Sequence, residues 1–353
     1  MKLLVTGVAG FIGSNFTHYW LSRHGHDEII GLDNLTYAGN LVNLKDLHGD
    51  QKKRFTFVKG DICDTGGVED IFCRNNIDLV INFAAESHVD RSIHDPQLFL
   101  RSNILGTANL LEAARNIWKD GDSWNPGKKF LQVSTDEVYG SLGPGGYFTE
   151  KTPLDPHSPY SVSKASADFL VKAYYDTYGM PVLITRCSNN YGPYQFPEKL
   201  IPLIINNALH HRSLPVYGDG KQIRDWLYVD DHCRAIDCVA SGGKPGEVYN
   251  VGGNNEHYNI DIVTLIIRIL REETDDAEIN DSLITFVRDR PGHDRRYAID
   301  PAKIQRELGW RPKTAFEEGI RSTIRWYLEH RDWMQSVISG EYMKFYETNY
   351  QKR

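Results

Sequence analysis

Two adjacent acidic residues follow an apolar run in the stretch FLQVSTDEVYG, residues 130–140. Asp136 and Glu137 come directly after Thr135, at the point where the apolar run ends. Neighbouring carboxylates repel each other, and burying either one costs free energy. A surface loop would accommodate both acids. Alternatively, they belong to a site that needs two acids with different roles.

A tyrosine and a lysine four residues apart form a second candidate pair. They are Tyr160 and Lys164 in SPYSVSKASADFL, and on a helix this spacing places both side chains on one face. A phenol is a poor base at neutral pH, but a nearby ammonium lowers its pKa. The pair could therefore take a proton from a sugar hydroxyl while a hydride leaves the same carbon. Because the motif is short, an exposed tyrosine and lysine on a helical turn are the alternative.

A glycine-rich stretch near the N-terminus predicts a dinucleotide site. VTGVAGFIGSNF places Gly7, Gly10 and Gly13 between an apolar run and a helical pattern. Glycine permits a tight turn there, lets the backbone approach a pyrophosphate, and exposes helix N–H groups to its negative charge. Asp33 ends the next apolar run, where a carboxylate accepts hydrogen bonds from ribose hydroxyls and repels a 2′-phosphate. Unless Asp33 is only a turn residue, the cofactor is NAD.

The elements that must position these residues alternate along the first 190 residues. Apolar runs predict strands at 2–6, 28–32, 55–58, 78–83, 129–134 and 181–186. Helical patterns lie near 11–23, 67–75, 95–118 and 160–178. Continuous apolar strands that alternate with helices predict an α/β fold with a Rossmann-type, doubly wound parallel sheet, covered by helices on both faces.

Residues at further strand ends extend the predicted cofactor site. Asp61 and Ile62 follow the third predicted strand, and Ala84 and Ala85 follow the fourth. Ligands of open α/β sheets bind at the carboxyl ends of strands. The acidic pair after the fifth strand lies at the same edge of the sheet, which favours a site over a surface loop.

The pattern changes after about residue 190, where glycine, proline and asparagine become frequent. Helical patterns remain, without a repeat or a long linker. We therefore expect a dinucleotide-binding domain at 1–190 and a smaller C-terminal α/β lobe that binds the substrate, mainly at 191–353. Some segments of the second range are expected to return to the first domain, and a cleft should lie between the two.

Composition and charge exclude several classes of protein. With 41% apolar and 25% charged residues the chain is typical of a soluble globular protein, and no apolar stretch is long enough for a membrane span. The formal net charge of −7 argues against nucleic acid as a partner. Glycine interrupts the apolar N-terminus at Gly7, so no signal peptide is expected. Five irregularly spaced cysteines predict reduced thiols in the cytoplasm, with neither a disulfide framework nor a metal site.

The glycine triplet combined with the Tyr160 and Lys164 pair resembles the extended short-chain dehydrogenase/reductase superfamily. Within it, longer blocks resemble the dTDP-glucose 4,6-dehydratase family, from residue 1 to about residue 330. These blocks are LTYAGN (35–40), AAESHVDRS (84–92), STDEVYG (134–140), CSNNYGPYQFPEKLIP (187–202), QIRDWLYVDDH (222–232) and DRPGHDRRYAID (289–300).

The resemblance implies an NAD-dependent hydro-lyase that acts on a nucleotide-linked glucose in three stages. C4 is oxidised, water is lost across C5 and C6, and hydride returns to C6. The product is a 4-keto-6-deoxy sugar nucleotide for rhamnose-type deoxysugar biosynthesis. By resemblance, Tyr160 is the base for the C4 hydroxyl, Lys164 is its electrostatic partner, and Thr135 hydrogen-bonds the same oxygen. Asp136 would protonate the departing C6 hydroxyl, and Glu137 would remove the C5 proton.

The motifs and the resemblance together define two sets of predicted binding residues. The cofactor set is Gly7, Gly10, Phe11, Ile12, Gly13, Asp33, Asn34, Asp61, Ile62, Ala84, Ala85, Asn103, Ser134, Tyr160, Lys164 and Asn190. The substrate set is Ser87, Thr135, Asn189, Glu198, Lys199, Leu200, Pro215, Val216, Tyr217, Arg224, Asn259, Arg290 and His293. Lys199, Arg224 and Arg290 would supply positive charge for a diphosphate. For Arg224, an ion pair with Asp219 or Asp225 is the alternative.

Three other functions stay open at this point. A sugar-nucleotide 4-epimerase also needs NAD, a tyrosine and a lysine, but it has no use for Asp136 and Glu137. A 4,6-dehydratase of another nucleotide sugar would carry the same catalytic residues. A non-catalytic protein that binds NAD or a sugar nucleotide would tolerate the loss of one of them, and none is missing. The resemblance also implies a homodimer, formed by the helices at 95–118 and around Tyr160.

Overall fold

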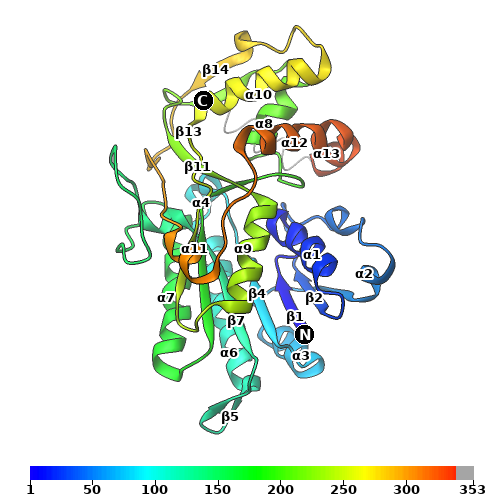
Figure 1. Ribbon diagram of the computed structural model, residues 1–353, viewed down its shortest axis with the longest axis vertical. Helices are drawn as coiled ribbons and strands as arrows, with labels where there is room; N and C mark the ends of the chain where they lie inside the picture. The colour runs from blue at the N-terminus through cyan, green and yellow to red at the C-terminus, as the bar shows by residue number, and fades with distance from the viewer. Residues whose placement is uncertain (339–353) are drawn as a thin grey trace.

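The computed structural model describes residues 1–338, and its centre is a seven-stranded parallel sheet (Figure 1). The strand order is β12-β8-β7-β4-β1-β2-β3, so the direction of winding reverses between β1 and β4. The strands are β1 (Lys2–Thr6), β2 (Glu28–Asp33), β3 (Phe55–Lys59), β4 (Leu79–Asn82), β7 (Lys129–Thr135), β8 (Val182–Cys187) and β12 (Val248–Val251). The predicted strands are all present and parallel, which confirms the Rossmann-type sheet.

Side chains of each strand alternate between two apolar cores, one on each face of the sheet. In β1, Leu3 and Val5 enter the core that also holds residues of α1 and α9, whereas Leu4 enters the core formed with α3, α6 and α7. Burial on both faces explains why the strands read as continuous apolar runs. The helices are α1 (Phe11–Arg23), α3 (Thr65–Asn75), α6 (Gly106–Trp118), α7 (Pro159–Tyr178) and α9 (Val229–Gly242).

Short elements complete the sheet domain. They are η1 (Leu41–Leu44), α2 (Gly49–Lys53), α4 (Val89–His94), α5 (Pro96–Phe99), η2 (Leu100–Leu105), the hairpin strands β5 (Lys119–Asp120) and β6 (Ser123–Trp124), and η3 (Asp136–Tyr139). The predicted helix at 95–118 therefore consists of α5, the π-helical turn η2 and α6. Such turns occur often at functional sites, because they redirect side chains locally.

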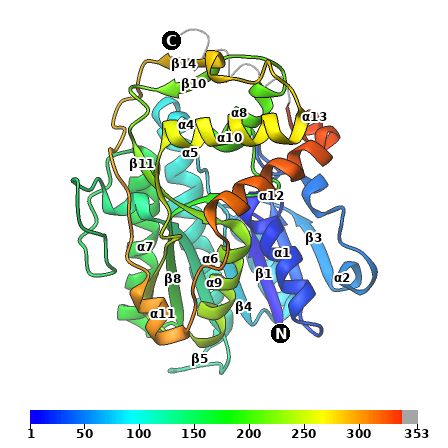
Figure 2. The ribbon, with the colours of Figure 1, turned by 45° about the horizontal axis from the view of Figure 1, so that its top comes forward.

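The upper lobe has an apolar core of its own (Figure 2). Its helices are α8 (Leu200–Ala208), α10 (Asn259–Thr274), α12 (Phe316–Glu329) and α13 (Arg331–Val337). Its other elements are β9 (Asn189–Tyr191), β10 (Leu214–Tyr217), β11 (Ile223–Tyr228), β13 (Glu256–Tyr258), η4 (Asp281–Leu283) and β14 (Ile284–Val287). β10 pairs with β14, and β11 pairs with both β9 and β13.

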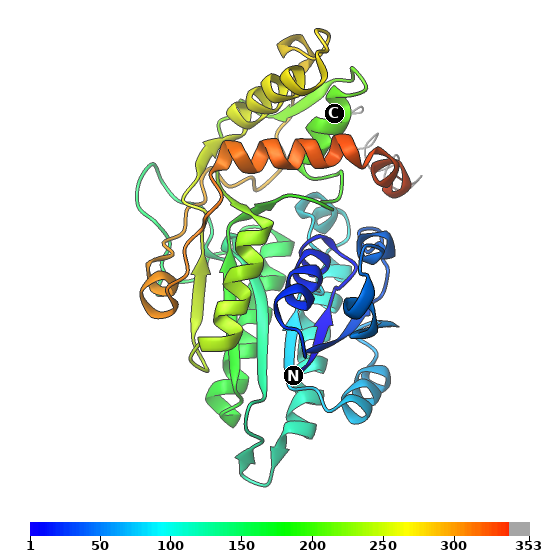
Figure 3. The same ribbon diagram turned by 45° about the vertical axis from the view of Figure 1, so that its right-hand side comes forward.

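The chain crosses between the two lobes more than once (Figure 3). β12 pairs with β8 at the edge of the main sheet, and α9 and α11 (Ala302–Leu308) pack against the same core. β12 was not predicted, because its four residues VYNV are too few to form a distinct apolar run. The predicted second lobe at 191–353 thus contributes segments to the sheet domain, while its residues 339–353 lie outside the described residues.

A buried carboxylate fixes one of these crossings. Asp231, in the first turn of α9, is 2% exposed and accepts the backbone N–H groups of Lys313 at 3.1 Å and Thr314 at 2.9 Å. It also pairs with Arg234, and its carbonyl accepts the Trp310 indole N–H at 3.1 Å. Burial alone would raise the pKa of Asp231, but the Arg234 side chain and the backbone N–H groups outweigh burial and lower it. Asp231 therefore holds the segment that leads from α11 to α12.

Replacing Asp231 by asparagine should lower the free energy of unfolding by about 2 kcal/mol at pH 7, because hydrogen bonds to a buried charge contribute ~1.5–3 kcal/mol. The folded pKa of Asp231 is lowered, so this stabilisation is present above about pH 4 and is lost as the pH falls through the folded pKa. Urea denaturation of wild type and variant, at pH 7 and again below about pH 4, measures the difference in free energy of unfolding. The exposed neighbour Asp230→Asn is the control, and an equal loss in both variants would contradict the assignment.

Candidate active site

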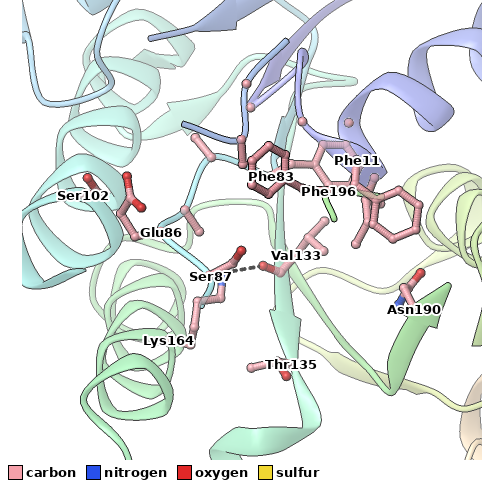
Figure 4. A pocket seen from close by; sticks show the side chains of 18 of the residues that line it. Phe11, Phe83, Glu86, Ser87, Ser102, Val133, Thr135, Lys164, Asn190 and Phe196 are labelled. Carbon is pink, nitrogen blue, oxygen red and sulfur yellow. Dashed lines mark hydrogen bonds between the residues drawn. The ribbon is translucent and has the colours of Figure 1, made fainter. Parts of the chain in front are cut away.

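A cavity lies at the carboxyl ends of β1, β4 and β7, where the winding of the sheet reverses, and Figure 4 shows side chains that line it. Its wall contains the predicted catalytic residues Thr135, Asp136, Glu137, Tyr160 and Lys164. From the predicted cofactor set it contains Gly7, Gly10, Phe11, Ile12, Gly13, Asp33, Asn34, Asp61, Ile62, Ala84, Ala85, Ser134 and Asn190. From the predicted substrate set it contains Ser87, Asn189, Glu198 and Lys199. Motifs far apart in the sequence thus meet in one cavity.

The glycine turn has the shape that a pyrophosphate requires. Gly7 has a φ of 64°, and a Cβ on it would lie 2.8 Å from the backbone nitrogen of Ala84. A Cβ on Gly13 would lie 2.2 Å from the Gly7 carbonyl oxygen. Gly10 caps α1 without a side chain, so the first N–H groups of the helix face the cavity. The turn can therefore bind the pyrophosphate of a dinucleotide. Residues larger than glycine would clash with the backbone at Gly7 and Gly13.

Asp33 faces the cavity from the end of β2 and also supports the glycine turn. Its Oδ2 accepts the Ala9 N–H at 2.9 Å, and its Oδ1 accepts the Leu35 N–H at 2.8 Å. Burial raises the pKa of this carboxyl, and the two hydrogen bonds oppose the rise. Each oxygen keeps a second lone pair for a ribose hydroxyl. Asp33 is therefore more than a turn residue after β2, because it also binds the backbone of the glycine turn that follows β1.

Buried polar side chains form a ladder beneath the cavity. The Thr6 hydroxyl donates to Asn82 Oδ1 at 2.6 Å, and Asn82 Nδ2 donates to Gln132 Oε1 at 2.8 Å. The Thr6 hydroxyl oxygen also accepts the Ala84 N–H at 3.1 Å. Because Thr6, Asn82 and Gln132 are all buried, losing one would leave its neighbours unsatisfied. The ladder fixes the ends of β1, β4 and β7 relative to one another.

Asn103, in the π-helical turn η2, lies behind the cavity wall and is 1% exposed. Its Oδ1 accepts the Glu86 N–H at 2.9 Å, and its Nδ2 donates to the Glu86 carbonyl at 3.0 Å and to Ser163 Oγ at 2.8 Å. The Ser163 hydroxyl in turn donates to the Tyr160 carbonyl at 2.7 Å. This geometry connects the loop after β4 to the helix that carries Tyr160. Positioning that helix is therefore the role that the contacts of Asn103 support.

Tyr160 and Lys164 project from the first turns of α7, which begins with a capping box at Ser158 and a proline at its first position. The Lys164 ammonium donates to the Val133 carbonyl at 2.7 Å, as Figure 4 shows. Burial, followed by the charge of Glu137, raises the pKa of Tyr160 well above its ordinary value. Burial is the largest of these effects, so the net shift of the Tyr160 pKa is upward, and the predicted lowering by the Lys164 ammonium stays a prediction.

The acidic pair adopts two different environments at the end of β7. Thr135 caps η3 by accepting the Glu137 N–H at 3.3 Å, and its hydroxyl donates to Asp136 at 3.4 Å. Asp136 is 1% exposed, and within residues 1–338 its Oδ2 has no hydrogen-bond partner. Burial, then Glu137 and Asp225, raise the pKa of Asp136 well above its ordinary value. Asp136 is therefore the residue of the pair that holds a proton.

Three cations surround Glu137. Burial raises the pKa of Glu137, but Arg290, Lys199 and Arg224 all act in the opposite direction. Lys199 donates to the Ser87 carbonyl at 2.9 Å, which brings it to the loop after β4. The neighbouring acids thus differ in environment: burial raises the pKa of both, but three cations oppose the rise at Glu137, whereas the pKa of Asp136 is raised well above its ordinary value. This difference excludes the surface-loop alternative for the pair and suits one acid and one base.

Arg224 does not form either of the ion pairs considered from its spacing. Asp219 pairs instead with Arg295 at 2.8 Å, and Asp225 accepts backbone N–H groups at positions 253 and 255. The Arg224 guanidinium donates to backbone carbonyls and lies 4.1 Å above the Tyr297 ring. Arg224 is 5% exposed, and its charge lowers the pKa of Glu137. Nothing in the sequence near Arg224 indicates this interaction.

The rest of the predicted substrate set lies beyond the cavity wall, on the upper lobe. Pro215, Val216 and Tyr217 belong to β10, and Leu200 and Asn259 begin α8 and α10. His293 contacts the Tyr217 ring edge-on at 6.0 Å, and Arg290 lies 3.9 Å from Asp90. Burial and the neighbouring arginines lower the pKa of His293 to about 3, so it is neutral.

Several residues of the cavity region were not predicted. Glu86 lines the cavity, and burial raises its pKa to about 7. Arg91 lies 3.7 Å above the Tyr37 ring and pairs with Glu198 at 3.0 Å. Glu86, Arg91 and Tyr37 belong to the blocks AAESHVDRS and LTYAGN, which were quoted only for their resemblance. The contacts of Arg91 with Tyr37 and Glu198 join residues from different blocks, so they could not be predicted from any one block.

Other kinds of site find no support in the described residues. Within residues 1–338, no group of three histidine, cysteine or acidic side chains is placed to hold a metal ion. The five cysteines are free thiols. Among the described helices, none has the length and apolar character needed to cross a membrane.

Comparison with known proteins agrees with this geometry. Residues 4–323 match the model of the family described as GDP-mannose 4,6 dehydratase. A dTDP-glucose 4,6-dehydratase of Xanthomonas campestris is 54% identical over 342 residues, covering 96% of each chain. A crystal structure of dTDP-glucose 4,6-dehydratase from Bacillus anthracis, in complex with NAD, is 48% identical with a TM-score of 0.85, covering 96% of this chain and 99% of that one.

A related epimerase is more distant. The structure of UDP-glucose 4-epimerase from Thermotoga maritima, with UDP-glucose, is 28% identical with a TM-score of 0.81, covering 93% of this chain and 99% of that one. The two enzymes share the architecture, whereas the dehydratases share about half of the sequence over full length. The chain belongs to the dTDP-glucose 4,6-dehydratase family, within the extended short-chain dehydrogenase/reductase superfamily.

Proposed function

We propose that this protein is an NAD-dependent 4,6-dehydratase of dTDP-glucose. The observation that carries the proposal is the burial of Asp136 beside Glu137 in the cavity that also contains Tyr160 and Lys164. The glycine turn and Asp33 would hold NAD⁺, which would supply the acceptor for a hydride from C4 of the sugar and its donor to C6. The upper lobe would hold the nucleotide.

Tyr160 takes the proton of the C4 hydroxyl, with Thr135 as a hydrogen-bonding partner of the same oxygen. Because burial raises the pKa of the Tyr160 phenol, its deprotonation requires positive charge nearby. The Lys164 ammonium is held in place by Val133 and supplies part of this charge. Oxidation makes C4 a ketone, which acidifies the proton on the adjacent C5.

Glu137 and Asp136 then remove water across C5 and C6. Glu137, whose negative charge is favoured by three nearby cations, takes the C5 proton, and Asp136, whose pKa burial raises well above its ordinary value, protonates the C6 hydroxyl as it leaves. The double bond between C5 and C6 accepts hydride at C6 and a proton at C5. The net change is the loss of one water, which gives dTDP-4-dehydro-6-deoxyglucose for deoxysugar biosynthesis.

An epimerase is the second candidate, since solved epimerases share the architecture. An epimerase oxidises C4 and returns the hydride to the same carbon, so it needs no acid at C6 and no base at C5. The different environments of Asp136 and Glu137 favour dehydration. A non-catalytic binding protein would have no reason to keep Asp136 buried beside a second acid at a cost in stability.

We also propose a homodimer in the cytoplasm. Leu105 in η2 and Phe169 in α7 are each 62% exposed, and Leu98 in α5 and Val162 in α7 are also exposed; α5 and η2 both pack against α7. Exposed apolar side chains on adjoining helices support an interface, and two such helices from each copy would form a four-helix contact. The free thiols support a reducing compartment.

The purified protein should convert dTDP-glucose into a product lighter by one water. Mass spectrometry of the nucleotide sugar checks this result without added cofactor, since NAD is regenerated in each turnover. Formation of dTDP-galactose at unchanged mass would support the epimerase instead. UDP-glucose and GDP-mannose are the controls for the nucleotide, and a faster reaction with either would overturn the assignment of dTDP-glucose.

Glu137→Gln should lower kcat by about 10²–10⁴-fold, which is the usual contribution of a general base. Exchange of the C5 proton with deuterated water should cease, while substrate still reduces the bound cofactor, as seen in its absorbance. Asp136→Asn is the matched variant at the neighbouring acid. It should permit C5 exchange but block water loss, and full C5 exchange in Glu137→Gln would contradict the assignment of the base.

Phe169→Lys should shift the protein from dimer to monomer, because it places a charge in the proposed helical interface. Sedimentation velocity at micromolar concentration measures the change. Phe286→Lys is the control, since Phe286 is 57% exposed on β14 in the upper lobe, away from α7. An unchanged sedimentation coefficient for Phe169→Lys, or an equal shift for both variants, would reject this interface.

A further inference from the structure

The segment 289–299 descends from β14 in the upper lobe to the sheet domain and carries Arg290 and His293 (Figure 1). Its backbone is bonded on two sides. On one side, Ile223 donates to the Arg295 carbonyl at 2.9 Å. On the other, the loop after η3 contributes the Leu142 N–H, which donates to the Arg296 carbonyl at 3.0 Å. The segment therefore lies between β11 and the loop that follows the acidic pair.

One carboxylate in this segment reaches the start of the catalytic helix. Asp294 is 8% exposed, and its Oδ1 lies 2.6 Å from His157 Nδ1. Its Oδ2 accepts the Tyr297 hydroxyl at 2.6 Å. His157 directly precedes Ser158, the cap of α7, and Tyr160 follows in the first turn. The His157–Asp294 pair thus joins the segment 289–299 to the helix of the catalytic tyrosine.

The same aspartate is connected to the acidic pair through Arg224. Its backbone carbonyl accepts from the Arg224 guanidinium at 3.0 Å, and Arg224 lies above the Tyr297 ring. Arg224 lowers the pKa of Glu137, whereas the charge of Asp294 raises it. Asp294 therefore lies between His157, which is partly exposed, and Arg224, a cation that lowers the pKa of Glu137.

We propose that His157 is a positioning residue for the dehydration. Its ion pair with Asp294 holds the segment 289–299, and with it Arg224, Arg290 and His293, in register with the catalytic helix. The proposal rests on the proposed function, because these residues act on the diphosphate and on Glu137. His157 itself contacts neither substrate nor cofactor.

The charge of His157 gives this role a pH dependence. The groups that face the pair are Asp155, 3.6 Å from His157 Nε2, and the Tyr297 hydroxyl and Arg224 guanidinium around Asp294. The hydrogen bond to Asp294 raises the pKa of His157 above its ordinary value. The ion pair is therefore complete below about pH 6.5 and is lost as the pH rises through the raised folded pKa.

The test compares wild type with His157→Ala in steady-state turnover of dTDP-glucose from about pH 6 to about pH 9. At the low end the variant should show a KM about threefold higher with kcat nearly unchanged, the modest effect expected for a pair that is partly exposed. At the high end the two KM values should converge, because wild-type His157 is then neutral. Equal KM values at about pH 6, or a ratio that is constant with pH, would overturn the proposal.

His157→Arg tests the charge directly. Because arginine stays charged at about pH 9, the His157→Arg variant should keep a low KM there, whereas the KM of wild type should have risen. A KM for His157→Arg that equals the KM of His157→Ala at every pH would overturn the proposal. The control is His211→Asn, which removes a comparable pair, since His211 lies 2.8 Å from Asp276 on the far side of the upper lobe. Its KM should follow wild type at every pH, and a change equal to that of His157→Ala would count against a specific role.

A second measurement does not depend on turnover. Hydrogen exchange of the backbone amides at 289–299 should be faster in His157→Ala than in wild type at about pH 6, without substrate. Unchanged exchange in this segment would overturn the positioning role. Absence of turnover in wild type would instead reject the proposed function, and the exchange comparison would then decide the role of His157 by itself.

Discussion

The placement of two adjacent carboxylates at the end of β7, one buried and one half-buried, is the constraint on which the rest of the site depends. Asp136 and Glu137 cannot both be charged there without cost, since Asp136 is removed from water and the two charges would repel each other. The structure resolves the conflict by leaving one oxygen of Asp136 without a partner and by surrounding Glu137 with cations. β7 belongs to the sheet domain, whereas Arg224 and Arg290 come from later segments of the chain. The chemistry therefore requires both lobes.

The repeated crossings of the chain serve this requirement. Asp231 fixes the path from α11 to α12, and the ladder that begins at Thr6 aligns the strand ends that form the cavity floor. Asn103 extends the ladder to the helix of Tyr160, and Asp294 connects the same helix to the upper lobe. Each connection is a buried polar group with satisfied partners, which resists sliding more than apolar contacts do. The catalytic groups thereby keep their distances although they come from many elements.

Much of this architecture was predictable because its causes are local in the sequence. Apolar runs of strand length, buried on both faces, identified six strands of the sheet. The glycine triplet predicted the turn, because only glycine tolerates the approach of the Gly7 position to Ala84. The spacing of Tyr160 and Lys164 predicted that both side chains lie on one face of a helix, and both residues belong to α7. β12 escaped prediction because its pairing with β8 depends on a tertiary contact, and its four residues carry too little pattern.

What local sequence determined is the order of the elements, the glycine turn and the chemical types available at each strand end. The tertiary structure decided how those groups ionise and what they contact. Burial raises the pKa of Tyr160, and Arg224, which forms no ion pair with Asp219 or Asp225, lowers the pKa of Glu137. The tertiary structure also paired His157 with Asp294. These outcomes depend on burial and on charges distant along the chain, which spacing alone does not encode.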